Sequence, residues 1–328
     1  MSTGSAVALA LLLAACTTPA VGHRMASERP RAPSTTPVRR RVQPHLEVSR
    51  SRFSLPVAVQ REVAVADGSG VLVAGGLDGS GSSTAGVYRV PSGAGPVTRV
   101  GTMGAPFHDA AAALLGGRLV VFGGGITAGT DLVQAFGGSV PGRLPTPISD
   151  VSAAVAGRSV VLVGGYDGVR FLSTVLVTRD ARTFRRLASL PRGLRYAAVT
   201  GVGDAVIVAG GLSAAGPVAT ILRIGVPDGS VRAIGRLPEP LAHAAAVTLG
   251  GDVYVLGGED ASGRTIRSIE RIDPRTGEVQ RISGLPGSVA DAAAVAVGSH
   301  TGLLIGGRRG PQGHDVALST ILELRLVR

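Results

Sequence analysis

From residue 46 onward, the chain alternates short apolar runs with clusters of glycine, proline and aspartate. Apolar runs of about 4–8 residues bounded by such turn residues are typical of β-strands. One example is Val253-Tyr254-Val255-Leu256, which is followed by Gly257-Gly258. No repeat of this pattern holds an apolar periodicity long enough to predict a helix. The pattern therefore predicts an all-β fold built from many short strands.

A pair of glycines follows a β-branched run six times. The pairs are Gly75-Gly76, Gly123-Gly124, Gly164-Gly165, Gly210-Gly211, Gly257-Gly258 and Gly306-Gly307. Subtracting the positions of successive first glycines gives intervals of 48, 41, 46, 47 and 49 residues. A self-similarity with a period in this range indicates a repeat architecture.

A second marker recurs in phase with the glycine pairs. It is a Leu-Pro dipeptide, or Met-Gly in one unit, and each copy precedes a strand rich in alanine and valine. The copies are Leu55-Pro56, Met103-Gly104, Leu144-Pro145, Leu190-Pro191, Leu237-Pro238 and Leu285-Pro286. Two markers in step over six copies define six equivalent structural units.

Each unit reads as four strands. In the fifth unit we expect strands over 244–249, 252–256, 268–273 and 278–282, with a turn at 274–277. Four-stranded units of this length, repeated radially, are the blades of a β-propeller. We therefore predict an all-β, six-bladed β-propeller over residues 46–328.

The last unit supplies strands over 292–297, 303–305 and 320–326, and its fourth strand has to come from elsewhere. Residues 46–53 lead into Leu55-Pro56, as 183–188 lead into Leu190-Pro191. We therefore expect the N-terminal strand to complete the last blade, which closes the ring and removes an exposed strand edge.

The order strand, glycine pair, loop, strand, turn and strand resembles the kelch repeat, and the resemblance extends over residues 46–328. A tyrosine of that family's pattern is matched by Tyr254 and Tyr88, whereas its fourth-strand tryptophan is absent, because the chain has no Trp. The resemblance implies a six-bladed kelch-type propeller. Copper oxidases of this fold need a Tyr–Cys crosslink, and the single cysteine, Cys16, lies outside the repeats.

The N-terminus has the pattern of an export signal. Residues 6–15 are an unbroken run of Ala, Val and Leu, suited to a signal-peptide core and too short for the roughly 20 residues of a membrane-spanning helix. The run ends in Leu13-Ala14-Ala15-Cys16, which resembles the lipobox of bacterial lipoproteins. We expect residues 1–16 to be a signal peptide, Cys16 to be lipidated, and the protein to be anchored in the cell envelope on the outer side of the cytoplasmic membrane.

Residues 17–45 are rich in Pro, Ser, Thr and Arg and lack apolar periodicity, so we expect a disordered tether. The net charge is +11, and the tether contributes +5 of it through six arginines and one glutamate. The remaining +6 is scattered, without a basic stripe interleaved with aromatic residues. We therefore expect no nucleic-acid partner.

Polar side chains recur where each unit begins its first strand. Counting six positions beyond each Leu-Pro marker gives Arg61, Asp109, Asp150, Tyr196, His243 and Asp291. The positions just before these are Gln60, His108, Ser149, Arg195, Ala242 and Ala290. We predict that the first set, with His108 and Arg195, rings one mouth of the propeller channel. Two interpretations remain: a ligand site of mixed charge, or a solvated rim whose arginines and aspartates satisfy one another.

The preferred function is binding of a protein or a glycan through this face, with no cofactor. A metal site built from His108, Asp109, Asp150, His243 and Asp291 is disfavoured, because these residues come from different blades and metal bonds are only about 2–2.5 Å long. The alternative is a carbohydrate-active enzyme. The chain also resembles, at the level of the fold, six-bladed sugar mutarotases, for which His108, Arg195 and Asp291 would suit acid–base work.

Overall fold

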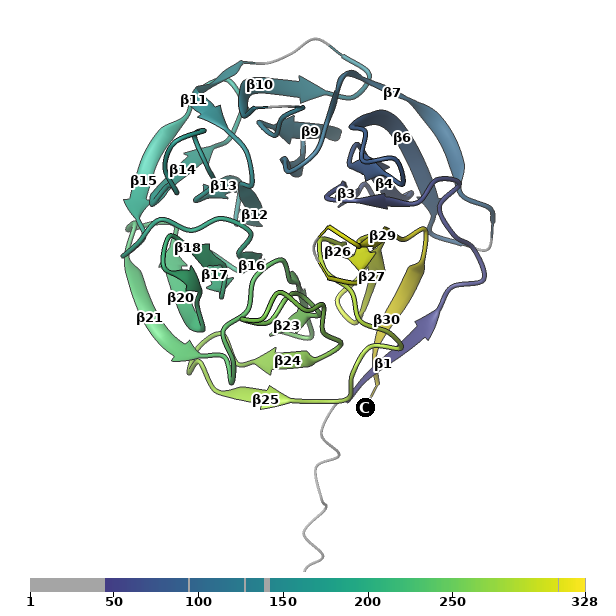
Figure 1. Cartoon of the computed structure of the whole chain (residues 1–328). Coiled ribbons are helices and arrows are strands. Elements are labelled where there is room, and N and C mark those ends of the chain that lie inside the picture. Colours follow the sequence, from purple (N-terminus) through teal and green to yellow (C-terminus); the bar gives the residue numbers. More distant parts are fainter. Residues whose placement is uncertain (1–44, 94, 127, 139–141, 312, 328) are drawn as a thin grey trace, which may run out of the picture. The chain divides into compact units, whose positions relative to one another are not determined.

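The computed structural model describes residues 45–328, except residues 94, 127, 139–141, 312 and 328 (Figure 1). Cys16, the predicted signal peptide and all of the predicted tether except His45 lie outside the described residues. Every regular element in the described part is a β-strand, so the all-β prediction is confirmed. The same residues hold no helix with the length and apolar character needed to cross a membrane.

Six four-stranded antiparallel sheets follow one another around a central channel (Figure 1). The innermost strands are β3 (Val63–Ala66), β8 (Ala111–Leu115), β12 (Ser152–Ala156), β16 (Ala198–Val202), β22 (Ala245–Leu249) and β26 (Ala293–Ala296). The second strands are β4 (Gly70–Ala74), β9 (Arg118–Phe122), β13 (Ser159–Val163), β17 (Ala205–Ala209), β23 (Asp252–Leu256) and β27 (Thr301–Ile305). The third strands are β6 (Thr84–Pro91), β10 (Thr130–Ala135), β14 (Thr174–Thr178), β20 (Thr220–Gly225), β24 (Ile269–Ile272) and β30 (Ile321–Val327). The outer strands are β7 (Thr98–Phe107), β11 (Arg143–Ile148), β15 (Arg185–Ser189), β21 (Val231–Arg236), β25 (Val279–Arg281) and β1 (His45–Arg50). The protein is a six-bladed β-propeller, as predicted.

The first and last strands close the ring. β1 pairs antiparallel with β30 in an unbroken register from His45 opposite Val327 to Arg50 opposite Leu322. Leu46 is buried in the same apolar cluster as Leu322 and Leu324. The predicted closure of the last blade by the N-terminal strand is confirmed, although β1 ends three residues earlier than expected.

The core lies between neighbouring blades. β13 and β17 are buried along their whole length, and Val161 and Val163 of β13 share one apolar cluster with Val206 and Val208 of β17. Since each second strand is covered on both faces by adjacent blades, it reads as a continuous β-branched run. Aliphatic side chains fill much of these interfaces, together with aromatic rings such as Phe107, Phe122 and Tyr254, so the family's tryptophan is not needed for packing here.

Three short two-residue ladders that the sequence did not predict lie in the loops after the glycine pairs; one joins its loop to a strand start, and the other two are hairpins within their loops. They pair β2 (Val59–Gln60) with β5 (Leu77–Asp78), β18 (Leu212–Ser213) with β19 (Gly216–Pro217), and β28 (Arg308–Arg309) with β29 (Val316–Ala317). Such ladders stiffen the loops that follow the glycine pairs and fix them beside the channel mouth.

Candidate functional site

The six predicted ring residues all adopt the left-handed backbone conformation. Arg61, Asp109, Asp150, Tyr196, His243 and Asp291 have φ values between 52° and 59°. Among the described non-glycine residues, only Ala181 shares this conformation. Positive φ is uncommon for residues with a Cβ, and such strain persists only where the surrounding structure enforces it.

A closed circle of backbone hydrogen bonds enforces it here. The N–H of Arg61 donates to the carbonyl of Asp291, and the N–H of Asp109 donates to the carbonyl of Arg61, at 2.8 and 3.3 Å. Asp150, Tyr196, His243 and Asp291 continue the sequence, each donating to the ring residue of the preceding blade at 2.7–3.4 Å. The circle therefore joins all six blades through their strand starts.

The residues just before the ring fasten each strand start to its own blade. Arg195 and Leu212 exchange both backbone hydrogen bonds, at 3.0 and 2.8 Å, and the five equivalent residues pair in the same way with the residue after their glycine pair. The glycines make this approach possible. Gly165 donates its N–H to the carbonyl of Leu194 at 2.8 Å, and a Cβ at Gly164 would overlap that same carbonyl oxygen.

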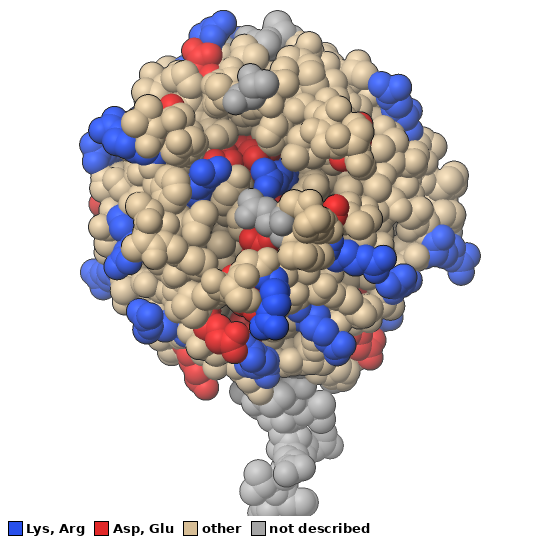
Figure 2. All heavy atoms as spheres, in the orientation of Figure 1, with Lys and Arg blue, Asp and Glu red and all other residues tan. Residues whose placement is uncertain are grey.

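The ring side chains line a cavity of about 140 Å³ in the channel, together with the residues that follow them just before the inner strands begin. Glu62, Ala110, Val151, Ser152, Ala197, Ala244 and Ala292 complete its wall. Figure 2 shows acidic and basic atoms gathered around this central hollow. The structure therefore brings the six ring residues together around one cavity at the channel mouth.

Asp291 is held by three cationic or proton-bearing groups. Its carboxylate accepts from His243 Nδ1 at 2.7 Å and from Arg308 Nε at 2.7 Å, and Arg61 Nε lies 3.6 Å away. Burial alone would raise the pKa of Asp291, but the neighbouring His243, Arg61 and Arg308 outweigh it and lower that pKa well below its ordinary value. Asp291 is therefore an ionised anchor.

At Asp109 the effect of burial prevails, and the pKa of its carboxyl group is raised. Burial, followed by the nearby carboxylates of Asp150 and Asp291, raises the pKa of Asp109 to about 8, although Arg61 Nη1 lies 2.9 Å from its Oδ2 and acts against the shift. Beside it, burial and the charge of Arg61 lower the pKa of His108, whose Nδ1 lies 2.8 Å from Ser83 Oγ. Burial therefore favours the protonated form of Asp109.

Arg195 forms the polar and aromatic part of the mouth. Its guanidinium pairs with Asp150 at 2.5 Å and donates to the Tyr196 hydroxyl at 2.8 Å. The same guanidinium lies 4.7 Å from the ring centroid of Tyr166 and 5.3 Å from that of Phe171. The Tyr196 ring stacks on the His243 ring at 3.9 Å. The result is a half-exposed platform of arginine and aromatic rings.

Several residues at this site were not predicted. Glu62 is buried in the cavity wall, and burial raises its pKa well above the ordinary value. Glu259 and Arg308 form a buried ion pair that also reaches Asp291, and Tyr166 contacts Arg195. The last three directly follow a glycine pair, so aligning the repeats at the residue after Gly-Gly would have placed them beside the ring.

Guanidinium groups lie between the carboxylates of the ring. Arg61 reaches both Asp109 and Asp291, Arg195 pairs with Asp150, and Arg308 bridges Asp291 and Glu259. Within the described residues, no three histidine or acidic side chains are arranged to hold a metal ion. Much of the charge at the mouth is compensated internally, while Arg61 Nε, Arg195 Nε and Glu62 Oε2 are buried without a hydrogen-bond partner among the described residues.

The shifted pKa of Asp109 predicts a pH dependence of stability. A carboxyl group whose pKa rises from 3.8 to about 8 on folding is favoured in its protonated form, so the free energy of unfolding falls as pH rises between these values and then levels. We expect Asp109→Asn to reduce that fall, as measured by urea denaturation at pH 5 and pH 8.5. Parallel losses of stability in the parent and the variant would contradict the assignment.

Comparison with known proteins locates one recognisable repeat. Residues 240–286 match the model of the kelch motif, and this segment covers β22 to β25, the fifth blade. No curated protein matches the chain. The matched segment is one blade of the structure. The chain therefore carries a kelch motif within a six-bladed β-propeller.

Proposed function

We propose that the protein is a binding module that engages a protein or a glycan partner through the face at the channel mouth. The observation that carries the proposal is the ring of six left-handed residues, which presents mixed charges around one opening. Strained, non-glycine positive-φ positions concentrate at functional sites, and the inference runs from the observed conformation to the function.

The Arg195 platform supports a recognition role. Arg195, at the start of the fourth blade beside Tyr196, lies over Tyr166 and Phe171 from the loop of the third blade, so one surface joins two blades. Arginine and tyrosine are enriched among the residues that dominate binding energies at interfaces. Their partial exposure leaves ring faces and guanidinium edges accessible to a partner.

The size of the cavity favours binding at the mouth over catalysis inside the channel. Small-molecule pockets usually enclose about 300–1,000 Å³, whereas the channel cavity measures about 140 Å³. Of the residues expected for acid–base work, Asp291 is engaged by His243 and Arg308, and Arg195 by Asp150. The sugar mutarotase alternative therefore has less support than the binding proposal.

Two rim substitutions test the proposed face. Against a glycan array and against proteins captured from detergent-solubilised envelope, we expect Arg195→Ala and Tyr166→Ala to weaken binding by more than about 1 kcal/mol each. Arg275→Ala is the matched control, because Arg275 is exposed in a turn at the other end of a blade.

Tyr166 holds no buried ion pair, so its variant separates binding from folding. Loss of binding in Arg275→Ala with silent rim variants would place the partner on the opposite face. If the rim variants lose binding only together with a lowered melting temperature, the ring has a structural role and does not form the binding surface.

We further propose that Cys16 carries a lipid that anchors the protein on the outer side of the cytoplasmic membrane. The support is the match of residues 13–16 to a lipobox, together with the absence of any other cysteine. Cys16→Ala should move the protein out of the membrane fraction or block its processing, and should abolish labelling by a fatty acid. Identical fractionation of parent and variant, with no label in either, would contradict the anchor.

A further inference from the structure

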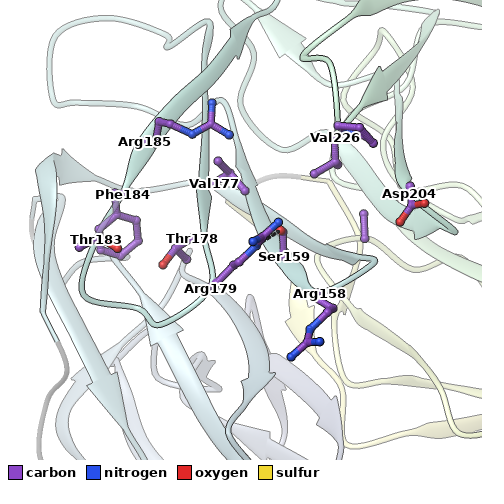
Figure 3. Close-up of a pocket in the computed structure, with 12 residues that line it drawn as sticks. Arg158, Ser159, Val177, Thr178, Arg179, Thr183, Phe184, Arg185, Asp204 and Val226 are labelled. Atoms are coloured by element: carbon purple, nitrogen blue, oxygen red, sulfur yellow. Dashed lines mark hydrogen bonds between the residues drawn. The ribbon is translucent and has the colours of Figure 1, made fainter.

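A polar groove lies between the third and fourth blades, at the end of the propeller opposite the ring. Inner strand β12 runs away from Asp150, so the turn between β12 and β13 is at the far end of the blade. The groove encloses about 540 Å³ and is lined by that turn, by the turn between β14 and β15, and by the corresponding turns of the fourth blade (Figure 3). Its volume falls within the usual range for small-molecule sites.

Arginines dominate the charge of the groove. Arg158, Arg179 and Arg185 line it against a single carboxylate, Asp204, which leaves a formal charge of 3 − 1 = +2. Figure 3 shows Arg179 meeting Ser159 in the middle of the view, with Arg158 and Arg185 on either side. Arginines therefore approach the groove from two turns of the same blade.

These charges are not neutralised by neighbouring side chains. Arg179 Nε donates to Ser159 Oγ at 3.2 Å, and Arg185 Nη1 donates to the carbonyl of Arg186 at 3.5 Å, so both acceptors are neutral. None of the three arginines forms an ion pair with a carboxylate in the described part of the chain. Elsewhere on the propeller, arginines such as Arg89 and Arg271 pair with an aspartate at 2.8 and 2.7 Å.

Asp180, an acidic residue in the turn between β14 and β15, is held by hydrogen bonds within that turn. Its Oδ1 accepts from the N–H groups of Arg182 and Thr183, both at 2.9 Å. These backbone hydrogen bonds, with further bonds from the Thr183 and Thr178 hydroxyls, lower the pKa of Asp180 to about 2. Asp180 therefore stays ionised, but its oxygens accept hydrogen bonds from its own turn, and in the described part of the chain it forms no ion pair with Arg158, Arg179 or Arg185.

The remaining lining suits a ligand larger than a lone ion. Ser159 is buried in the lining, and Thr178 and Thr183, whose hydroxyls donate to Asp180, contribute their carbon atoms beside it. Phe184 forms part of the wall and is positioned by an edge-to-face contact with Phe122, with the ring centroids 6.2 Å apart. Val226 and Pro227 of the fourth blade supply further apolar surface.

We propose that this groove binds a small molecule bearing a phosphate group. Guanidinium forks suit phosphate because they offer paired donors in a planar geometry, and a dianion matches the formal +2 of the lining. The phosphate sits among Arg158, Arg179 and Arg185, and the uncharged part of the ligand lies against Phe184. This site is independent of the proposed channel-mouth function, because it lies at the other end of the blades.

Titration calorimetry of the full chain with glycerol 3-phosphate tests the proposal. We expect saturable binding that weakens by about tenfold or more in Arg179→Gln and in Arg185→Gln, since hydrogen bonds to charged groups contribute about 1.5–3 kcal/mol. Asp204→Asn should tighten binding several-fold, because it removes the one carboxylate of the lining. The matched control is Arg99→Gln, an exposed arginine on outer strand β7 that lines none of these surfaces.

A second experiment measures binding of the same proteins to vesicles that contain phosphatidylglycerol. Arginine-dependent binding to vesicles alone would identify a lipid headgroup as the source of the phosphate, whereas binding to glycerol 3-phosphate identifies a free ligand. Absence of binding in both arms, or an equal loss in Arg99→Gln, would overturn the proposal. Because these substitutions change exposed side chains, unchanged melting temperatures are expected in all four variants.

Discussion

The N–H groups of six residues, one from each blade, donate to the carbonyl of the neighbouring blade's equivalent residue until the circle returns to its start. A propeller blade contacts only its two neighbours, so a break at any interface would open the ring. The circle supplies a directional constraint that apolar packing between blades lacks, because hydrogen bonds fix both distance and angle. The pairing of β1 with β30 makes the circle possible, since it places the sixth blade beside the first.

The chemistry of the channel mouth is a consequence of that circle. A residue that donates to its neighbour's carbonyl in the left-handed conformation brings its side chain to the cavity wall, and six such side chains share about 140 Å³. In this small space arginines lie between carboxylates, and the pKa values of two aspartates shift in opposite directions. Asp291 is held ionised by His243, Arg61 and Arg308, whereas burial and neighbouring carboxylates keep the pKa of Asp109 near 8.

The repeats and the ring could be predicted from the sequence because both depend on local, periodic signals. In most glycine pairs a Cβ on the first glycine would overlap a backbone carbonyl of the next blade, as Gly164 would with Leu194, and counting from the Leu-Pro markers reached all six ring residues, including His243 and Tyr196. The partners of those residues could not be predicted in the same way. The contact of Arg308 with Glu259 joins residues 49 apart, and Glu62 has an apolar or small residue at the equivalent position of every other blade. The groove between the third and fourth blades depends on how the turns of two different blades face each other, which no single repeat encodes.

Amide hydrogen exchange at the ring residues tests the central claim most directly. If the circle binds the six blades into one cooperative unit, the amides of Arg61, Asp150, His243 and Asp291 exchange only through global unfolding, at the rate of the inner strands. The amide of Val169, whose side chain is exposed and whose N–H bonds within a local turn, provides the fast reference. Ring amides that exchange as fast as that of Val169 would show that the circle opens locally and that apolar packing alone holds the propeller together.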